Sequence, residues 1–273
     1  MHRRGRAAMS SSVPRHHGRV LDAWLDLVLG SRCAGCGAPG RALCVGCDGA
    51  LARVAAEAWP TPTPPGLVRP SATAAYGDQV RAMVIAHKEE GRLALARPLG
   101  RLLGAAVLDA ALAPAAGTVP PRQATGIDLV PVPSHPAVVR QRGHDPLLRI
   151  ARVAAGDLRR QGFDVRVRRL LRVTGARPGD QAGLDAAARA ANLDGRFTTR
   201  PRAGDAAGRR GGNGHERVLV IVDDVITTGA TLREAQRALE AAGFPPHAAA
   251  CVAATRRRLP AGGPPLPRSG PED

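Results

Sequence analysis

Aromatic residues are nearly absent from this 273-residue chain, which contains three phenylalanines, two tryptophans and one tyrosine. A buried core must therefore be built mainly from valine, leucine, isoleucine and alanine. The scarcity also weakens the case for a surface that binds single-stranded nucleic acid, because such surfaces stack bases on aromatic side chains. The length allows one large domain, or one medium domain with a small module.

Lysine is rarer still. Lys88 is the only lysine, so all the other residues among the 39 that are lysine or arginine are arginines. With 23 acidic residues, the formal net charge is +16. A positive charge of this size favours binding to phosphate, on a small molecule or on nucleic acid, although a GC-rich coding bias also explains much of the arginine. Because an ammonium is a compact point charge, the single lysine points to a position that needs one. Chance retention of one lysine is the alternative.

Long apolar runs are also missing, and no stretch approaches the roughly 20 apolar residues that span a bilayer. The apolar run after the basic N-terminus, VLDAWLDLVLG at 20–30, contains Asp22 and Asp26, which the core of a signal peptide would avoid. Its apolar residues recur at helical spacing, which predicts a short amphipathic helix. We therefore expect a cytoplasmic protein without a membrane span.

Cysteine is scarce, yet four of the five cysteines fall in the short stretch CAGCGAPGRALCVGC. They form two CxxC pairs, Cys33 with Cys36 and Cys44 with Cys47, which could supply the four thiolates of a closed structural Zn²⁺ site. Two disulfides are the alternative, disfavoured because no signal peptide is evident. A redox pair fits less well, because two neighbouring pairs saturate one metal. Cys251 lies alone in an apolar run and is expected to be a buried small residue.

Strands and helices alternate along the remainder, which predicts a parallel sheet in an α/β domain. Strands are expected at 72–76, 127–133, 165–173, from 218 onward and at 247–255. A helix is expected to carry Val80, Met83, Val84 and His87, and further helices are expected around 92–112, 144–162 and 232–243. The expected segments are a disordered basic N-terminus (1–19), an amphipathic helix with a zinc-ribbon-like module (20–59), a linker (60–71), the α/β domain (72–256, with a flexible insertion at 198–216) and a disordered tail (257–273).

The stretch VLVIVDDVITTGATL, residues 218–232, predicts a ligand site. Its apolar run is typical of a strand buried on both faces and leads into Asp223 and Asp224, and the following TTGAT loop opens a helix. Ligands of open α/β sheets bind at the carboxyl ends of the strands. N–H groups at the helix start, with Gly229 allowing close approach, form a phosphate cradle. Carboxylates beside it suit sugar hydroxyls or Mg²⁺.

This stretch has two other interpretations. An apolar strand followed by two aspartates also occurs in P-loop NTPases, but that class needs G-x-x-x-x-G-K-[ST] upstream. The only lysine lies in IAHKEEG, which does not fit. The second is a helix-capping turn without a ligand. It is disfavoured because two adjacent acids at a buried strand end are costly without a partner.

On these residues, VLVIVDDVITTGATL resembles the phosphoribosyl-pyrophosphate (PRPP) binding motif of type I phosphoribosyltransferases. Three further stretches narrow the resemblance to the ComF family: the four-cysteine segment, DLVPVPSHPAVVRQRGHDPLLRIA, and QAGLDAAARAANLDGRF. The resemblance covers roughly residues 20–256. It implies a type I phosphoribosyltransferase-like parallel sheet flanked by helices, with a small N-terminal zinc-binding module.

The resemblance also implies site residues. Asp223 and Asp224 would hold the ribose hydroxyls, directly or through Mg²⁺, and Lys88 would neutralise phosphate charge as the third catalytic residue. The implied phosphate-binding residues are Thr227, Thr228, Gly229, Ala230 and Thr231 for the 5′-phosphate, Pro133, Ser134 and His135 facing the pyrophosphate, and Arg140 or Arg142 as further cations. Gln181, Arg189 and Asn192 match a family signature to which no firm chemistry is assigned; a structural clamp over the site is an equal interpretation.

The chain departs from the family where R-G-F-N-Q is common, because it has Arg142-Gly143-His144-Asp145-Pro146 instead. If that loop contacts the acceptor, the acceptor of this protein differs or is absent. His144 is a candidate general base; the alternative is that it occupies the place of the missing aromatic residue.

Three functions stay open at this point. The first is Mg²⁺-dependent transfer of a phosphoribosyl group from PRPP to an unknown nitrogenous acceptor. The second is a non-catalytic competence factor that associates with single-stranded DNA and DNA-uptake proteins through the zinc module and the basic surface. The third is a PRPP sensor without turnover. The sequence leaves the oligomeric state undetermined.

Overall fold

The computed structural model describes residues 32–51, 53–113, 126–174, 195–200 and 217–255. The helix expected within 20–30, the signature residues Gln181, Arg189 and Asn192, most of the expected insertion, and both terminal segments lie outside the described residues. Among the described helices, none is both long and apolar enough to cross a membrane.

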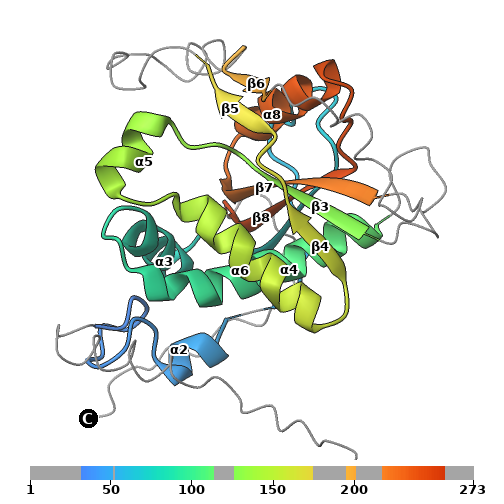
Figure 1. The fold of residues 1–273 in the computed structure, drawn as a ribbon. Helices are drawn as coiled ribbons and strands as arrows, with labels where there is room; N and C mark the ends of the chain where they lie inside the picture. Colours follow the sequence, from blue (N-terminus) through green and yellow to red (C-terminus); the bar gives the residue numbers. More distant parts are fainter. Residues whose placement is uncertain (1–31, 52, 114–125, 175–194, 201–216, 256–273) are drawn as a thin grey trace, which may run out of the picture.

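A six-stranded sheet forms the centre of the molecule, in the order β1-β2-β8-β7-β3-β4 (Figure 1). All neighbours pair in parallel except β1 and β2. The strands are β1 (Ala56–Glu57), β2 (Pro70–Ala75), β3 (Gly126–Pro131), β4 (Asp164–Val167), β7 (Arg217–Ile226) and β8 (Ala248–Ala254); a separate antiparallel pair is β5 (Leu171–Val173) with β6 (Phe197–Thr199). The expected parallel α/β sheet is confirmed.

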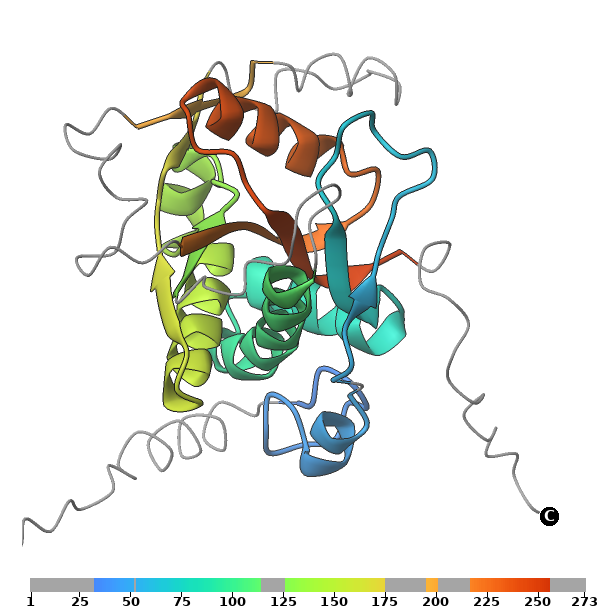
Figure 2. The same ribbon diagram turned by 90° about the vertical axis from the view of Figure 1, so that its right-hand side faces the viewer.

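Helices cover both faces of the sheet (Figure 2). The helices α4 (Ala96–Leu112) and α6 (Pro146–Arg160) pack on one face, and α8 (Ala230–Ala241) packs on the other with β5 and β6. The remaining helices are α2 (Val45–Gly49), α3 (Asp78–Lys88), the 3-10 turn η1 (Leu93–Leu95) and α5 (Pro136–Arg142). This three-layer arrangement follows from strands that are apolar on both faces and need cover on each.

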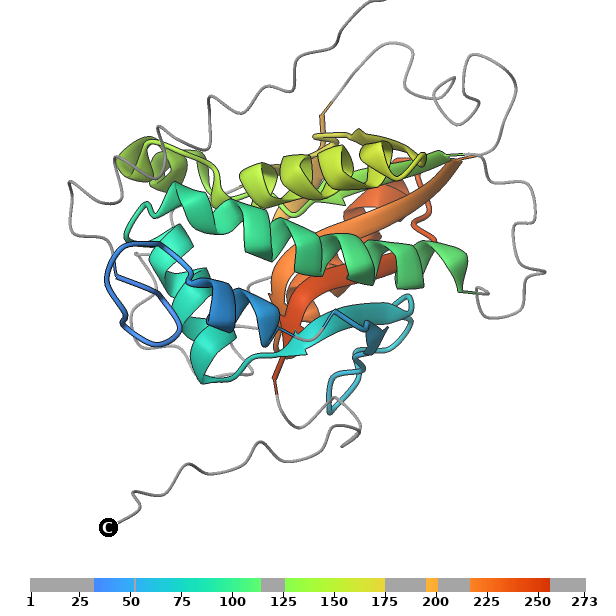
Figure 3. The same ribbon diagram turned by 90° about the horizontal axis from the view of Figure 1, so that it is seen from below.

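The alternation of side chains along β7 divides the core into two clusters. Val218, Val220 and Val222 pack toward α4 and α6, whereas Leu219 and Ile221 pack toward α8. The helices α4 and α6 lie side by side against the first face (Figure 3). Their contact is close at Gly100, where a Cβ would lie 2.6 Å from Cγ1 of Val153. The aliphatic core expected from the composition is therefore divided between two faces of one sheet.

The strand expected at 165–173 is two strands in two different sheets. After β4 ends at Val167, the backbone N–H of Arg168 donates to the carbonyl of Leu129 at 2.8 Å. The chain then turns away and begins β5 at Leu171, which pairs with Thr199 of β6. A continuous β-rich sequence carries no local mark of this change of sheet, so the expectation of one strand was wrong.

The segment expected to be a linker, 60–71, is held against α8. The side chain of Gln236 accepts a hydrogen bond from the N–H of Val68 at 2.9 Å and donates to the carbonyl of Gly66 at 2.8 Å. Arg233 donates to the carbonyl of Pro65 at 3.0 Å. These side chains lie 168 or more residues away in the sequence, so local composition could not reveal the contact.

Candidate functional site

The two aspartates lie near the carboxyl end of β7, which continues past them to Ile226. Asp223 is in register with Cys251 of β8, on the α8 face, and Asp224 reaches the opposite face. Each carboxylate accepts a hydrogen bond from the next backbone N–H: Asp223 from Asp224 at 2.8 Å, and Asp224 from Val225 at 2.9 Å. Oδ2 of Asp224 is left for a further partner.

Lys88 is the partner of Asp224. Its Nζ lies 2.9 Å from Oδ2 of Asp224, and the two side chains are 39% and 17% exposed. Lys88 is the last residue of α3, so the helix that follows β2 delivers the ammonium to the end of β7. Burial would lower the pKa of Lys88, but the Asp224 and Asp223 carboxylates outweigh it and hold that pKa above its ordinary value.

Asp223 has a strongly raised pKa. Burial, followed by repulsion from the Asp224 carboxylate, raises the pKa of Asp223 to about 8, although Lys88 and the N–H of Asp224 oppose the rise. The two acids therefore hold a proton near neutral pH until a ligand or a cation compensates their charge. Perturbed acids of this kind cluster at functional sites.

The TTGAT loop leads from β7 into α8, which begins at Ala230. Thr227 and Thr228 are exposed, and Oγ1 of Thr228 accepts from the N–H of Ala230 at 3.4 Å. Gly229 has a φ of +73° and leaves no room for a Cβ, which would lie 2.8 Å from Cγ of Pro60. The first N–H groups of α8 follow the aspartates after one short loop, and N–H groups at the start of a helix bind anions.

The loop after β3 carries the residues expected to face a pyrophosphate. Ser134 is partly exposed, whereas Nδ1 of His135 accepts the N–H of Ala137 at 3.2 Å and so caps α5. Arg142, at the end of α5, donates to the Glu89 carboxylate at 2.6 Å, next to Lys88 in the chain. The structure therefore brings Arg142 close to Lys88, and His135 caps a helix. Arg140 is exposed and lines a hollow that also includes Arg169 and Arg172.

His144 holds the turn between α5 and α6 against the end of α3. Its Nδ1 lies 3.1 Å from the carbonyl oxygen of Arg142, and its Nε2 lies 3.2 Å from that of His87. The rings of His144 and His87 meet edge to face, 5.7 Å apart. Because both ring nitrogens of His144 face backbone carbonyls, this geometry favours the interpretation that His144 replaces the missing aromatic residue, not that it acts as a base.

Sequence reasoning missed His87, Glu89 and Pro60, which build the surroundings of the site. His87 is buried with Nδ1 3.2 Å from the carbonyl of Arg92 and Nε2 3.3 Å from that of Pro146, and burial lowers its pKa. The only available signal was the sequence HKEE around the single lysine. Nothing local identified Pro60 as a neighbour of Gly229.

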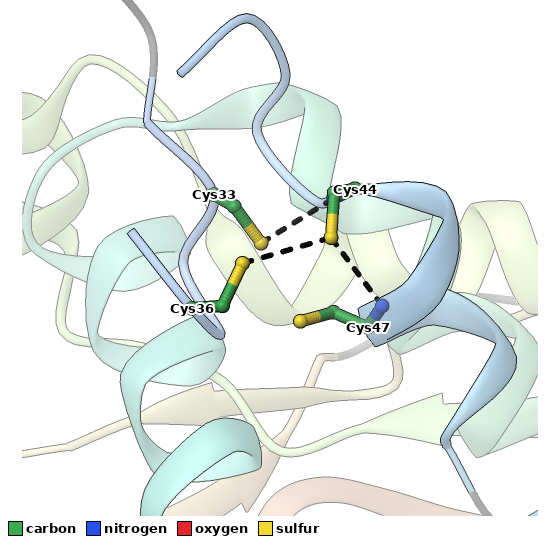
Figure 4. A group of neighbouring side chains, drawn as sticks. All are labelled: Cys33, Cys36, Cys44 and Cys47. Atoms are coloured by element: carbon green, nitrogen blue, oxygen red, sulfur yellow. Dashed lines mark hydrogen bonds between the residues drawn. The ribbon is translucent and has the colours of Figure 1, made fainter. Parts of the chain in front are cut away.

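The four N-terminal cysteines form a compact cluster (Figure 4). Their sulfur atoms all lie within 4.8 Å of one another, and Sγ of Cys36 and Cys44 are 3.7 Å apart. A tetrahedral zinc with bonds of about 2.3 Å requires sulfur–sulfur distances of about 3.8 Å. All five cysteines of the chain are described, and all are free thiols. The cluster could therefore bind a metal such as zinc, and disulfides are absent.

The pKa values of Cys33 and Cys47 are also consistent with a bound cation. Burial opposes the ionisation of Cys33, but N–H donors from Cys44, Cys36 and Gly35 prevail and lower its pKa to about 6. Burial and the neighbouring thiols raise the pKa of Cys47 to about 12. Four thiolates this close need a positive ion between them, as a structural zinc site supplies.

The four-cysteine module packs onto the α/β layers at α3 and α4. Ala42 and Leu51 join the core cluster of that face. Nε2 of Gln79 donates to the carbonyl of Cys47 at 2.8 Å, and Arg101 pairs with Asp48 at 2.6 Å. Metal binding would therefore order a segment that contacts the helix carrying Lys88.

We expect the purified protein to contain close to one zinc per chain, and Cys36→Ser to lose it. The physical reason is that three thiolates bind zinc far more weakly than a closed set of four. Metal content would be measured by plasma mass spectrometry after dialysis. Cys251→Ala is the matched control, because Cys251 is buried in β8 and far from the cluster in the chain. Retention of zinc by Cys36→Ser, or its loss from Cys251→Ala, would contradict this site.

A scan against protein-family models and a search of curated proteins find no match to this chain. The functional proposal therefore rests on the residues and on their geometry.

Proposed function

We propose that this protein binds PRPP, or a closely related phosphorylated ribose, with Mg²⁺ at the carboxyl end of β7. The observation that carries the proposal is the arrangement of the only lysine on Asp224, with Asp223 beside it and the helix start of α8 directly after them. This arrangement combines a cation, two acids and a phosphate cradle. The ComF resemblance and the parallel sheet support a type I phosphoribosyltransferase-like fold.

Each chain segment has a defined part in this proposal. The N–H groups of the TTGAT loop and the hydroxyls of Thr227 and Thr228 bind the 5′-phosphate. Asp223, next to Asp224 at the end of β7, accepts hydrogen bonds from the ribose hydroxyls. Lys88 and Arg142, now paired with Asp224 and Glu89, would attract the pyrophosphate. Mg²⁺, when bound near these acids, supplies charge neutralisation for the pyrophosphate.

The reaction that these residues support is a displacement at C1 of the ribose. The lone pair of an acceptor nitrogen forms a bond to C1, the bond from C1 to the pyrophosphate oxygen breaks, and that electron pair leaves with pyrophosphate. The acceptor nitrogen then loses a proton to solvent. The protein contributes by positioning the two reactants and by balancing charge.

The proposal is tested by titrating PRPP with Mg²⁺ into the purified protein in a calorimeter. We expect saturable binding, and at least tenfold weaker binding by Asp223→Ala/Asp224→Ala, because that variant removes both acids and the partner of Lys88. Ribose without phosphate is the ligand control and should not bind measurably. Equal binding of PRPP by the variant, or no binding by either protein, would sink the proposal.

A DNA-uptake role is the weaker alternative. A hollow of about 470 Å³ between α4 and α6, beside the four-cysteine module, is lined by Arg97, Arg101, Arg152 and Arg160. This charge favours phosphate groups. Two of these arginines, however, are already paired, with Asp48 and Asp157, and no aromatic residue lines the hollow for base stacking.

A further inference from the structure

A second hollow lies at the carboxyl end of β3. It has a volume of about 280 Å³ and is formed by the loop after β3, α5, the start of α6 and the β5–β6 pair. This is close to the lower limit for small-molecule pockets, which run from about 300 to 1,000 Å³. Neither the aspartates nor the TTGAT loop lines this hollow, whereas Pro133, Ser134 and Arg140, which the resemblance assigns to the pyrophosphate, do.

Arginine dominates the polar lining of this hollow. Arg140, Arg169, Arg172 and Arg200 all contribute to it. Within the parts of the chain that the structure describes, the guanidinium groups of Arg140, Arg169 and Arg172 have no hydrogen-bond or ion-pair partner, and Nε of Arg200 contacts only the carbonyl of Leu171, at 3.5 Å.

A single acid lines the same hollow. Oδ1 of Asp145 accepts the N–H of Leu148 at 3.1 Å, so Asp145 serves as the cap of α6. One engaged carboxylate leaves most of the arginine charge uncompensated. The hollow therefore favours an anion.

The other half of the lining is aliphatic. Val132, Val139, Leu148, Leu171 and Val173 form an apolar wall, and no aromatic side chain lines the hollow. Such a wall accommodates an apolar body, while the arginines favour a carboxylate or phosphate at one end. Ser134, from the loop expected to face pyrophosphate, also lines the hollow.

We infer that this hollow binds a second, separate ligand: a small organic acid with an apolar body. This inference rests on the proposed function in one respect, because such an acid, with a nucleophilic nitrogen on its body, would be the acceptor of the phosphoribosyl group. The shared loop containing Ser134 would bring the acceptor next to the PRPP site. The acceptor class is then set by arginines outside the PRPP motif, at Arg169 and Arg172.

The test compares benzoate with benzamide, two probes of one shape that differ in charge, by ligand-observed NMR titration of the full chain. We expect benzoate to bind and benzamide to bind at least tenfold more weakly. Arg169→Gln/Arg172→Gln should weaken benzoate binding about tenfold or more. Arg81→Gln/Arg166→Gln is the matched control, because it removes two exposed arginines outside the hollow and should bind benzoate like the wild type.

Repeating the benzoate titration with saturating PRPP and Mg²⁺ tests whether the hollow binds an acceptor acid or the pyrophosphate of PRPP. Benzoate binding that persists supports a separate acceptor site, whereas full competition by PRPP means that the hollow holds the pyrophosphate and overturns the inference. Equal binding of benzoate and benzamide, or equal effects of the two arginine pairs, also overturns it. If benzoate binds as expected but PRPP does not bind at all, the proposed function fails and the acceptor assignment fails with it. If PRPP binds and benzoate does not, only this inference fails.

Discussion

The affinity of the protein for PRPP with Mg²⁺ is expected to rise by roughly 50-fold between pH 6 and pH 8, because Asp223 must ionise to accept the ribose hydroxyls. Burial and the neighbouring Asp224 raise the pKa of Asp223 to about 8, so most of the free protein holds a proton there at pH 6. A ligand that needs the carboxylate must displace this proton. Its affinity therefore rises close to tenfold per pH unit and levels off above pH 8.

Calorimetric titrations from pH 6 to pH 9, in buffers of different ionisation enthalpy, would measure both the affinity and the protons released. We expect close to one proton released per PRPP bound at pH 6.5. A phosphate group of the ligand also titrates near pH 6, so Asp223→Asn is the necessary control. That variant should bind more weakly at pH 8 and show only the pH dependence of the ligand.

The raised pKa of Asp223 also makes the stability of the folded protein depend on pH. The pKa of Asp223 is raised above its ordinary value of 3.8, so the folded state holds a proton that the unfolded chain loses. This contribution to stability is complete below about pH 4 and is lost as the pH rises toward 8. The Asp223→Asn variant should therefore remain folded at pH 8. Wild-type affinity that does not change with pH, without proton release beyond that of the variant, would exclude Asp223 as the ionising group.

Arg217→Met is expected to lower the free energy of unfolding by about 3–5 kcal/mol, because it leaves the buried Asp128 carboxylate without its main partner. The side chains of Arg217 and Asp128 are 3% and 6% exposed, and Nε of Arg217 lies 2.7 Å from Oδ1 of Asp128. Arg217 also pairs with Asp164 and donates to the carbonyl of Ile127 at 3.0 Å. One guanidinium thus joins β7, β3 and β4 at the amino end of the sheet.

Urea unfolding followed by circular dichroism would measure this loss. Arg166→Met is the matched control: its ion pair with Asp164 is exposed and 3.7 Å long, so a change below about 1 kcal/mol is expected. Arg217→Met/Asp128→Leu should recover much of the stability, because removing both buried charges costs less than leaving Asp128 with Arg168 alone, at 3.3 Å. If Arg217→Met and Arg166→Met were equally mild, the buried pair would have no special role in stability.

Several features follow from local sequence alone. The apolar run before Asp223 requires a strand covered on both faces, and the structure places it between two layers of helices. The CxxC spacing brings four sulfurs together because each pair closes over one short turn. Gly229 precedes α8 at a position of positive φ that glycine adopts without strain. These features depend on neighbours within a few residues, so the sequence states them directly.

Other features depend on the order of the strands, which no local pattern encodes. The pairing of Lys88 with Asp224 joins residues 136 positions apart and forms only because β2, β8 and β7 are neighbours. The sequence singled out Lys88 as the only lysine, but only the tertiary structure showed that Asp224 is its partner. His135 shows a role that the motif did not indicate, since this residue, expected to face the pyrophosphate, also caps α5.

The sequence by itself therefore determined the parallel α/β architecture, the four-cysteine cluster and the strand–loop–helix that carries the aspartates, because periodicity, spacing and turn chemistry are local. Only the tertiary structure decided which charges meet. It placed Arg217 on Asp128, divided the expected strand at 165–173 between two sheets, and gathered Arg169, Arg172 and Arg200 around one hollow. In a chain with 39 basic residues, most arginines look alike in sequence, and packing alone distinguishes those that support the fold from those left open to a ligand.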